Sequence, residues 1–148
     1  MLKKSAFNIH DLYAHESEQM GARMKKLGDA EFEIMEVLWR HDSPLTSNEI
    51  LDEIIEKRNW KLPSLMTVLS RLSEKGFVYC DRSTRTNYYH SLISEDEYKV
   101  NQSESFLEKM YSRSAQKFIA GLYQGKKLSP YDIKELRKYL DSLEKDGE

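Results

Sequence analysis

Apolar residues recur at helical spacing in one stretch, which ends at a glycine and is followed by two short runs of strand-forming residues. The helix begins at Pro63, whose missing N–H costs nothing in a first turn, and stops before Gly76. Its apolar positions share one face and are Leu65, Val68, Leu69 and Leu72. Residues 77–80 and 88–90 read as strands separated by a polar loop, so this stretch predicts a helix and a β-hairpin.

Two further helices are predicted before this stretch. The first covers residues 29–40 and is broken by the polar run that ends at Pro44. Phe32, Met35 and Trp39 share one stripe of this helix, and its other large apolar residues are Ile34, Val37 and Leu38. The second begins at Thr46, which forms a capping box with Glu49, and runs to about residue 58. The residues that bury this second helix are Ile50, Leu51 and Ile54.

Three helices and a hairpin in this order predict a winged helix-turn-helix domain over residues 28–92, with helix 63–75 as the recognition helix. The fold class is therefore mainly α with a small β-hairpin. The candidate DNA-binding residues are Lys61, Ser64, Thr67, Ser70 and Arg71 on or beside the helix, and Arg82 and Arg85 in the hairpin loop. The alternatives are a solvated helix face, and a winged helix that binds another protein.

Residues 93–148 predict a helical dimerisation domain. A second capping box at Ser94 and Glu97 opens one helix, a second helix closes at Gly125, and Pro130 starts the last helix. The apolar positions expected in the dimer contact are Phe106, Leu107, Met110, Phe118, Ile119, Leu122, Ile133, Leu136 and Leu140. The alternative is packing of these stripes against the N-terminal domain of the same chain. Dimerisation is favoured because three short amphipathic helices have more apolar face than one small domain covers.

Residues 1–27 predict an N-terminal arm that is partly ordered at best, because scattered apolar residues lie among charges. His10 and His15 are the only candidates for a metal site there. Their spacing of five places them off a common helix face, so we expect no metal site.

The charge of the chain is unevenly placed, although its net value is only −2. Residues 28–58 have nine acids and three bases, net −6, whereas residues 59–91 have five bases and two acids, net +3. The net charge excludes a generally basic nucleic-acid binder. The contrast between the two stretches favours contact with DNA through one restricted surface.

Other features exclude several classes of protein. Cys80 is the only cysteine, so no internal disulfide is expected, and no apolar run reaches the length of a membrane span. The N-terminal residues do not read as a secretory signal, which predicts a cytoplasmic protein without a membrane partner. No Gly-rich phosphate loop, nucleophile motif or Cys/His pair supports catalysis, and no cofactor is expected.

The blocks LGDAEFEIMEVLWRHDSPLTSNEI, MTVLSRLSEKGFVY and NYYHSLISEDE, with Trp60 between the first two, resemble the penicillinase-repressor family of the BlaI, MecI and CopY type. The resemblance covers about residues 27–144. It implies a homodimeric winged-helix repressor that binds a palindromic operator of double-stranded DNA and controls resistance or efflux genes. It also implies that Ser64, Thr67 and Arg71 belong to the DNA-facing helix.

This sequence departs from the family pattern in three respects. Pro63 and Met66 stand where some relatives have basic residues, so base recognition by long cations is reduced and the operator is expected to differ. The cysteine cluster of copper-responsive relatives is missing, which excludes metal sensing by that route. Gly121 and Leu122 occupy the place of the Asn-Phe bond that is cleaved in other relatives. The resemblance therefore leaves an inactivating protease or a sensor as a further partner, without naming the signal.

Overall fold

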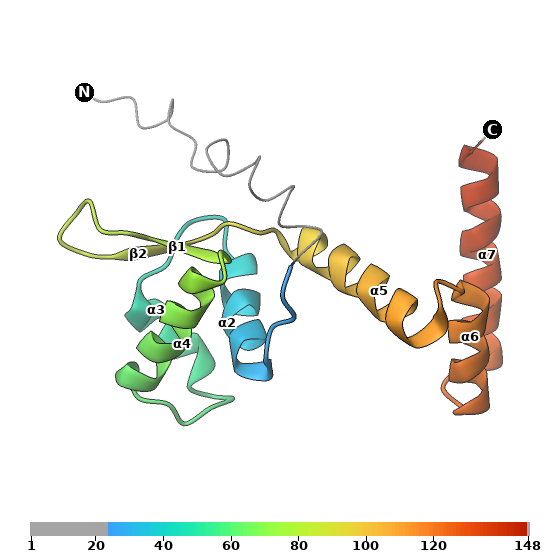
Figure 1. The fold of residues 1–148 in the computed structure, drawn as a ribbon, viewed down its shortest axis with the longest axis horizontal. Helices are drawn as coiled ribbons and strands as arrows, with labels where there is room; N and C mark the ends of the chain where they lie inside the picture. The colour runs from blue at the N-terminus through green and yellow to red at the C-terminus, as the bar shows by residue number, and fades with distance from the viewer. Residues whose placement is uncertain (1–23, 148) are drawn as a thin grey trace. The chain divides into compact units, whose positions relative to one another are not determined.

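The structure is a computed structural model that describes residues 24–147 (Figure 1). The predicted arm, including His10 and His15, lies outside the described residues as far as residue 23. The chain divides into two compact units, one ending at Gln102 and the other beginning at Ser103. No helix among residues 24–147 is both long and apolar enough to cross a membrane.

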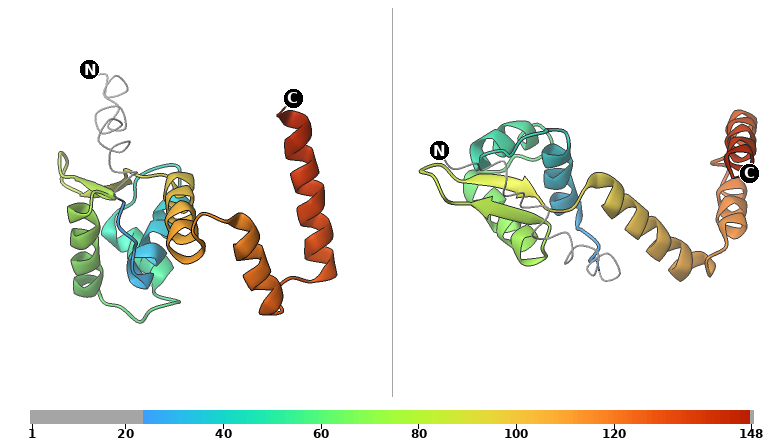
Figure 2. Two further views of the ribbon diagram at one scale, coloured as in Figure 1. Left: turned by 45° about the vertical axis from the view of Figure 1, so that its right-hand side comes forward. Right: turned by 90° about the horizontal axis from the view of Figure 1, so that it is seen from above.

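The first unit is a winged helix-turn-helix, as the sequence predicts. Its elements are α2 (Asp29–Trp39), α3 (Ser47–Ile54), α4 (Leu62–Glu74), β1 (Val78–Asp81), β2 (Tyr88–Ser91) and the first turns of α5 (Glu95–Tyr111). The two strands form an antiparallel hairpin that pairs Val78 with Ser91 and Asp81 with Tyr88. Viewed from above, the loop of this hairpin extends beyond the helices of the unit (Figure 2).

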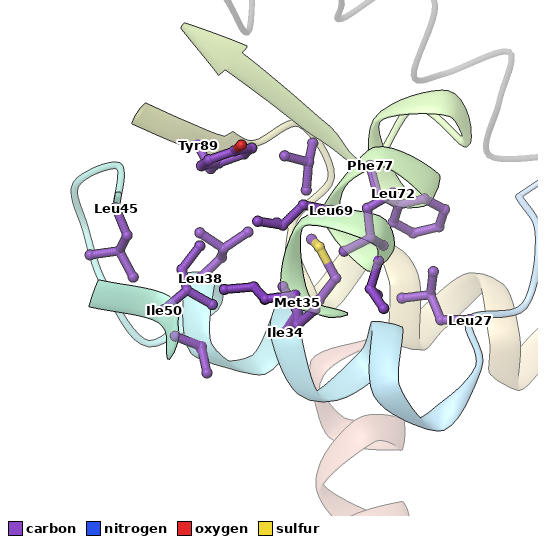
Figure 3. Packing of buried hydrophobic residues seen from close by; sticks show 14 of the residues in the cluster. Leu27, Ile34, Met35, Leu38, Leu45, Ile50, Leu69, Leu72, Phe77 and Tyr89 are labelled. Atoms are coloured by element: carbon purple, nitrogen blue, oxygen red, sulfur yellow. The ribbon is translucent and has the colours of Figure 1, made fainter. Parts of the chain in front are cut away.

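The core of the first unit lies where α2, α3 and α4 meet beneath the hairpin (Figure 3). Its most deeply buried side chains are Ile34, Met35, Ile50, Ile54, Leu65, Leu69, Leu72, Phe77 and Ile93. The predicted apolar face of α4 is confirmed, because Leu65, Val68, Leu69 and Leu72 are all buried. Burial of these leucines directs the opposite face of α4 to solvent.

Helix α4 stops at the predicted glycine. Gly76 has a φ of 81°, which an L side chain rarely adopts. The N–H of Phe77 donates to the carbonyl of Leu72, and the N–H of Gly76 donates to that of Ser73, which completes a Schellman motif. Phe77 therefore belongs to the helix stop and the core, and β1 begins one residue later than predicted, at Val78.

One predicted helix end is wrong. The second helix ends at Ile54 instead of near residue 58, and Arg58 forms an ion pair with Glu33 of α2 and lies 5.3 Å from the ring centre of Trp60. After Ile54 the chain forms a turn in which the N–H groups of Lys57 and Arg58 both donate to the carbonyl of Ile54. In the first helix, the predicted stripe does face the core, since Met35 is fully buried and Phe32 and Trp39 are partly buried against it.

Tyr98 explains why the first unit includes the start of α5. Its ring lies 5.6–6.0 Å from the rings of Phe32, Trp39 and Phe77, and its hydroxyl accepts a hydrogen bond from the N–H of Leu27. The indole N–H of Trp39 donates to the carbonyl of Ile93 at 2.8 Å. The unit thus extends ten residues beyond the domain end expected at residue 92.

In the second unit, the later part of α5 is followed by α6 (Ala115–Gln124) and α7 (Pro130–Asp146). The hydroxyls of Ser114 and Ser129 accept hydrogen bonds from the N–H groups of Lys117 and Asp132, which caps both helices. Phe106, Tyr111 and Phe118 form an aromatic cluster with ring centres 5.5–5.8 Å apart. Even so, none of the residues 103–147 is buried.

One ion pair joins α2 to the end of α4. Glu31 is only 8% exposed, and its Oε1 accepts hydrogen bonds from the Lys75 ammonium at 2.7 Å and from the N–H of Gly28 at 2.9 Å. Burial alone raises the pKa of Glu31, but the bonds from Lys75 and Gly28 and the charges of Lys75 and Arg71 more than offset it, so the pKa is lowered. Oε2 of Glu31 is buried without a partner, so the pair with Lys75 is the main compensation for its charge.

We predict that Lys75→Met lowers the free energy of unfolding at pH 7 by about 1–3 kcal/mol, since a buried carboxylate loses its cation. A lowered pKa stabilises the fold above the ordinary carboxyl range, and this stabilisation is lost as the pH falls through the lowered value. In the variant Glu31 takes up a proton at higher pH, so the difference in unfolding free energy between the variant and the natural chain becomes smaller towards about pH 4. Urea unfolding at both pH values measures this.

The matched control is Lys99→Met, which removes a surface ion pair with Glu95 in the same unit. Its effect is expected to stay within about 0.5 kcal/mol at either pH. Equal effects of the two substitutions would contradict the assigned role of Lys75.

Candidate nucleic-acid interface

The outward face of α4 consists of small polar residues and one arginine. The residues predicted to face DNA on this helix are all exposed, and they are Ser64, Thr67, Ser70 and Arg71. Lys61, which is the N-cap residue of α4, is also exposed. Because α4 is packed through its leucine face, this surface is available to a partner without rearrangement of the core.

Thr67 makes a local hydrogen bond that changes what it offers to a partner. Its hydroxyl donates to the carbonyl of Pro63 at 3.0 Å, one turn earlier in the helix. The proton of the hydroxyl is therefore used within α4, and its methyl group and oxygen lone pairs remain for other contacts.

Met66 does not belong to the outward face. Its sulfur lies 3.8 Å from the hydroxyl of Tyr89 in β2, and the side chain packs against the core. Tyr89 is itself 4% exposed and exchanges backbone hydrogen bonds with Leu45, the residue before the cap of α3. Met66 therefore fixes the hairpin to α4, which explains why a long cation is unsuited to this position.

The hairpin loop places two arginines in solvent. Arg82 and Arg85 are both exposed. The loop is shaped by its own polar residues, because Asp81 accepts a hydrogen bond from the N–H of Ser83, and the hydroxyl of Thr84 donates to the carbonyl of Thr86. Guanidinium groups at an ordered loop tip suit contact with phosphate oxygens.

The basic side chains of this region are of two kinds, paired and exposed. Lys75, which contributes to the local excess of positive charge, is engaged by the buried Glu31. Arg71 remains exposed one turn earlier, and its charge acts on the same carboxylate. The sequence missed both the Lys75 pairing and the role of Met66, since each depends on a residue more than twenty positions away and has no local signal.

The residues expected in the dimer contact keep much of their surface in solvent. Within the second unit, Phe106, Met110 and Leu140 are 46%, 59% and 49% exposed. The remaining members are partly buried, and they are Leu107, Phe118, Ile119, Leu122, Ile133 and Leu136. Tyr123, Tyr131 and Tyr139 add exposed apolar surface that the predicted set did not contain. No cluster of metal-ligating side chains occurs among the described residues of either unit.

Comparison with known proteins gives consistent matches. The profile of a family described as penicillinase repressor matches residues 27–142. The methicillin resistance regulatory protein MecI of Mammaliicoccus sciuri is 28% identical over 122 residues, which are 82% of this chain and 98% of that protein. The penicillinase repressor of Bacillus licheniformis is 29% identical over 119 residues, or 80% of this chain and 92% of that one.

Solved structures of BlaI are also similar. The solution structure of the DNA binding domain of the repressor BlaI is 32% identical and covers 51% of this chain and 90% of its own, with a TM-score of 0.45. The Bacillus licheniformis BlaI monomeric form, solved in complex with the blaP half-operator, gives the same identity and coverage and a TM-score of 0.44.

Proposed function

This chain belongs to the penicillinase repressor family of DNA-binding winged-helix transcriptional repressors, and from this premise we propose that it represses its target genes as a homodimer bound to a palindromic operator. The first unit binds double-stranded DNA, and the second unit joins two chains. The observation that carries the proposal is the exposed face of α4 beside two exposed arginines of the hairpin loop.

The division of labour on DNA follows from the chemistry of these residues. Ser64, Thr67, Ser70 and Arg71 of α4 enter the major groove, where short hydroxyls and one guanidinium reach base edges. Lys61, Arg82 and Arg85 contact phosphates and set the position of the helix. Because Glu31 neutralises Lys75, few cations are left to contact phosphates. Contacts with base edges therefore make up a larger share of the binding free energy than general attraction to phosphate would otherwise allow.

Dimerisation is supported by the apolar side chains of the second unit, since one chain leaves all of them at least partly exposed. A C2 dimer buries the same surface on both chains. Two recognition helices then meet successive major grooves about one helical turn apart, which requires an operator with two-fold symmetry.

The regulated genes and the location are inferred from relatives. Several relatives are named as regulators of methicillin resistance or as penicillinase repressors. We therefore assign resistance or efflux genes to this chain as its targets. The protein is placed in the cytoplasm, where this DNA lies. Release from DNA requires a further partner, for which an inactivating protease or a sensor protein is the simplest choice. A winged helix that binds only proteins is the competing function.

The first test is an anisotropy titration of the full chain against the DNA upstream of its own gene at two salt concentrations. Tight, salt-sensitive binding that survives excess unrelated duplex supports the operator-specific repressor. Weak binding that is equal for every duplex, also after selection from random sequences, would favour the protein-binding alternative.

We predict that Arg71→Ala weakens operator binding about tenfold without dissociating the dimer, because one base contact of about 1–3 kcal/mol is lost. Arg82→Ala instead flattens the salt dependence by about 0.9 log units of affinity per log unit of salt, since one phosphate contact is lost. Anisotropy at three salt concentrations separates the effects. Unchanged affinity and slope in both variants would refute the assignment of this face.

We predict that a chain ending at Ser112 stays folded and becomes monomeric, because the first unit has its own core and the removed helices contribute none of its buried residues. Half-operator contact alone weakens binding by at least about a hundredfold, as the second half-site is no longer held in place. Sedimentation equilibrium reports the mass, and anisotropy the affinity. A truncated chain that remains dimeric would show that the association surface lies elsewhere.

A further inference from the structure

We propose that the first half of α4 recognises the 5-methyl groups of thymine, with Thr67 and Pro63 as the residues that select them. This inference rests on the proposed function, because it names the base that the recognition helix selects in its operator. It is carried by the exposed ridge of the helix and by the hydrogen bond within it.

The outermost ridge of α4 runs through Pro63, Thr67 and Ser70, at positions i, i+4 and i+7. All three are exposed, and they lie opposite the buried leucines of the helix. A helix that enters the major groove with its leucine face against the core presents this ridge to the floor of the groove. Pro63 and Thr67 are thus the first side chains of the ridge to meet a base edge.

This part of the ridge is apolar in character although Thr67 is a polar residue. Pro63 presents ring methylenes and has no N–H to donate. The hydroxyl of Thr67 donates to the carbonyl of Pro63, so its proton is not available to a base. What the pair offers is a methyl group beside a ring, which matches a methyl group in the groove.

The same half of the helix lacks the side chains that read other bases. Residues 62–70, LPSLMTVLS, contain no Arg or Lys for guanine and no Asn or Gln for adenine. Ser64 and Ser70 are exposed, but a serine hydroxyl can donate to an acceptor or accept from a donor, so it discriminates poorly between bases. Met66 is held by Tyr89 in the hairpin. Arg71 is the first side chain along the helix that suits guanine.

Thymine is the base that fits this surface. Its major-groove edge carries an acceptor oxygen and a methyl group, and cytosine differs there by a donor amine and the lack of the methyl. Contact between Thr67 and a thymine methyl removes apolar surface from water on both molecules. We therefore expect thymines in each half-site opposite Pro63 and Thr67, followed by a guanine within reach of Arg71.

The test deletes single methyl groups from DNA. An operator is first chosen by selection from random duplexes with the full chain, and each thymine of one half-site is then replaced by deoxyuridine. We expect one or two positions at which this replacement weakens binding about three- to fivefold, the effect of burying one methyl group. Other thymines serve as internal controls and are expected to change the affinity little.

Substitution of the protein identifies the reader. Thr67→Ser deletes the methyl group and keeps the hydroxyl, so it is expected to weaken binding to the thymine duplex and to abolish the difference between thymine and deoxyuridine at one position. Thr67→Val keeps a methyl group and is expected to retain that difference. Thr86→Ser in the hairpin loop removes the same group from another exposed threonine and is expected to behave like the natural chain. Thermal unfolding confirms that each variant is folded.

The outcomes separate this inference from the proposed function. Tight, sequence-specific binding that is insensitive to deoxyuridine at every position overturns methyl recognition and leaves the repressor assignment intact. Sensitivity that persists unchanged in Thr67→Ser overturns the role of Thr67. Weak binding to every duplex, with nothing enriched by the selection, overturns the proposed function and this inference with it.

Discussion

Burial of one leucine face of α4 is the constraint on which the rest of the first unit depends. With Leu65, Leu69 and Leu72 fixed against α2 and α3, the rotation of the helix about its axis is set, and so is the set of residues that meet a partner. The left-handed Gly76 then turns the chain directly into the hairpin. Met66 and Tyr89 join the hairpin back to the same helix. The strands of the hairpin are therefore held against α4, and the loop with Arg82 and Arg85 extends from them.

The buried carboxylate of Glu31 changes the charge of this surface by pairing with Lys75. Glu31 keeps its charge in a nearly dry position because the Lys75 ammonium and the N–H of Gly28 both bind one of its oxygens. In doing so it removes a cation from the set that attracts DNA without regard to sequence. Arg71, one turn earlier, is exposed and forms no ion pair with any residue of the part of the chain that the structure describes. Pairing of Lys75 with Glu31 thus leaves Arg71 as the one cationic side chain within α4.

The sequence predicted those features that depend on residues close together in the chain. The capping pairs Thr46–Glu49 and Ser94–Glu97, the glycine stop at Gly76 and the leucine face of α4 are all present in the structure. All seven residues predicted to contact DNA are exposed, but their contacts with DNA stay a prediction.

The features that the sequence could not predict arise between distant residues. Arg58 pairs with Glu33 of α2, and Tyr98 of α5 packs on Phe32 and Phe77. No local spacing encodes such contacts, because they form only once the three helices are assembled. The dimer contact stays a prediction as well, since it requires a second chain.

The exposure of Thr67, Ser70 and Arg71 has a consequence for how such a protein diverges from its relatives. Side chains outside the core contribute little to folding, so their replacement usually changes stability by less than about 0.5 kcal/mol. Under the proposed function, a lineage can therefore exchange one operator for another by single substitutions at these three exposed positions without passing through an unstable ancestor. Met66 is different, because any change there disturbs the hairpin. The fold thus leaves these three exposed residues free to change with the operator, whereas Met66 is constrained by its packing.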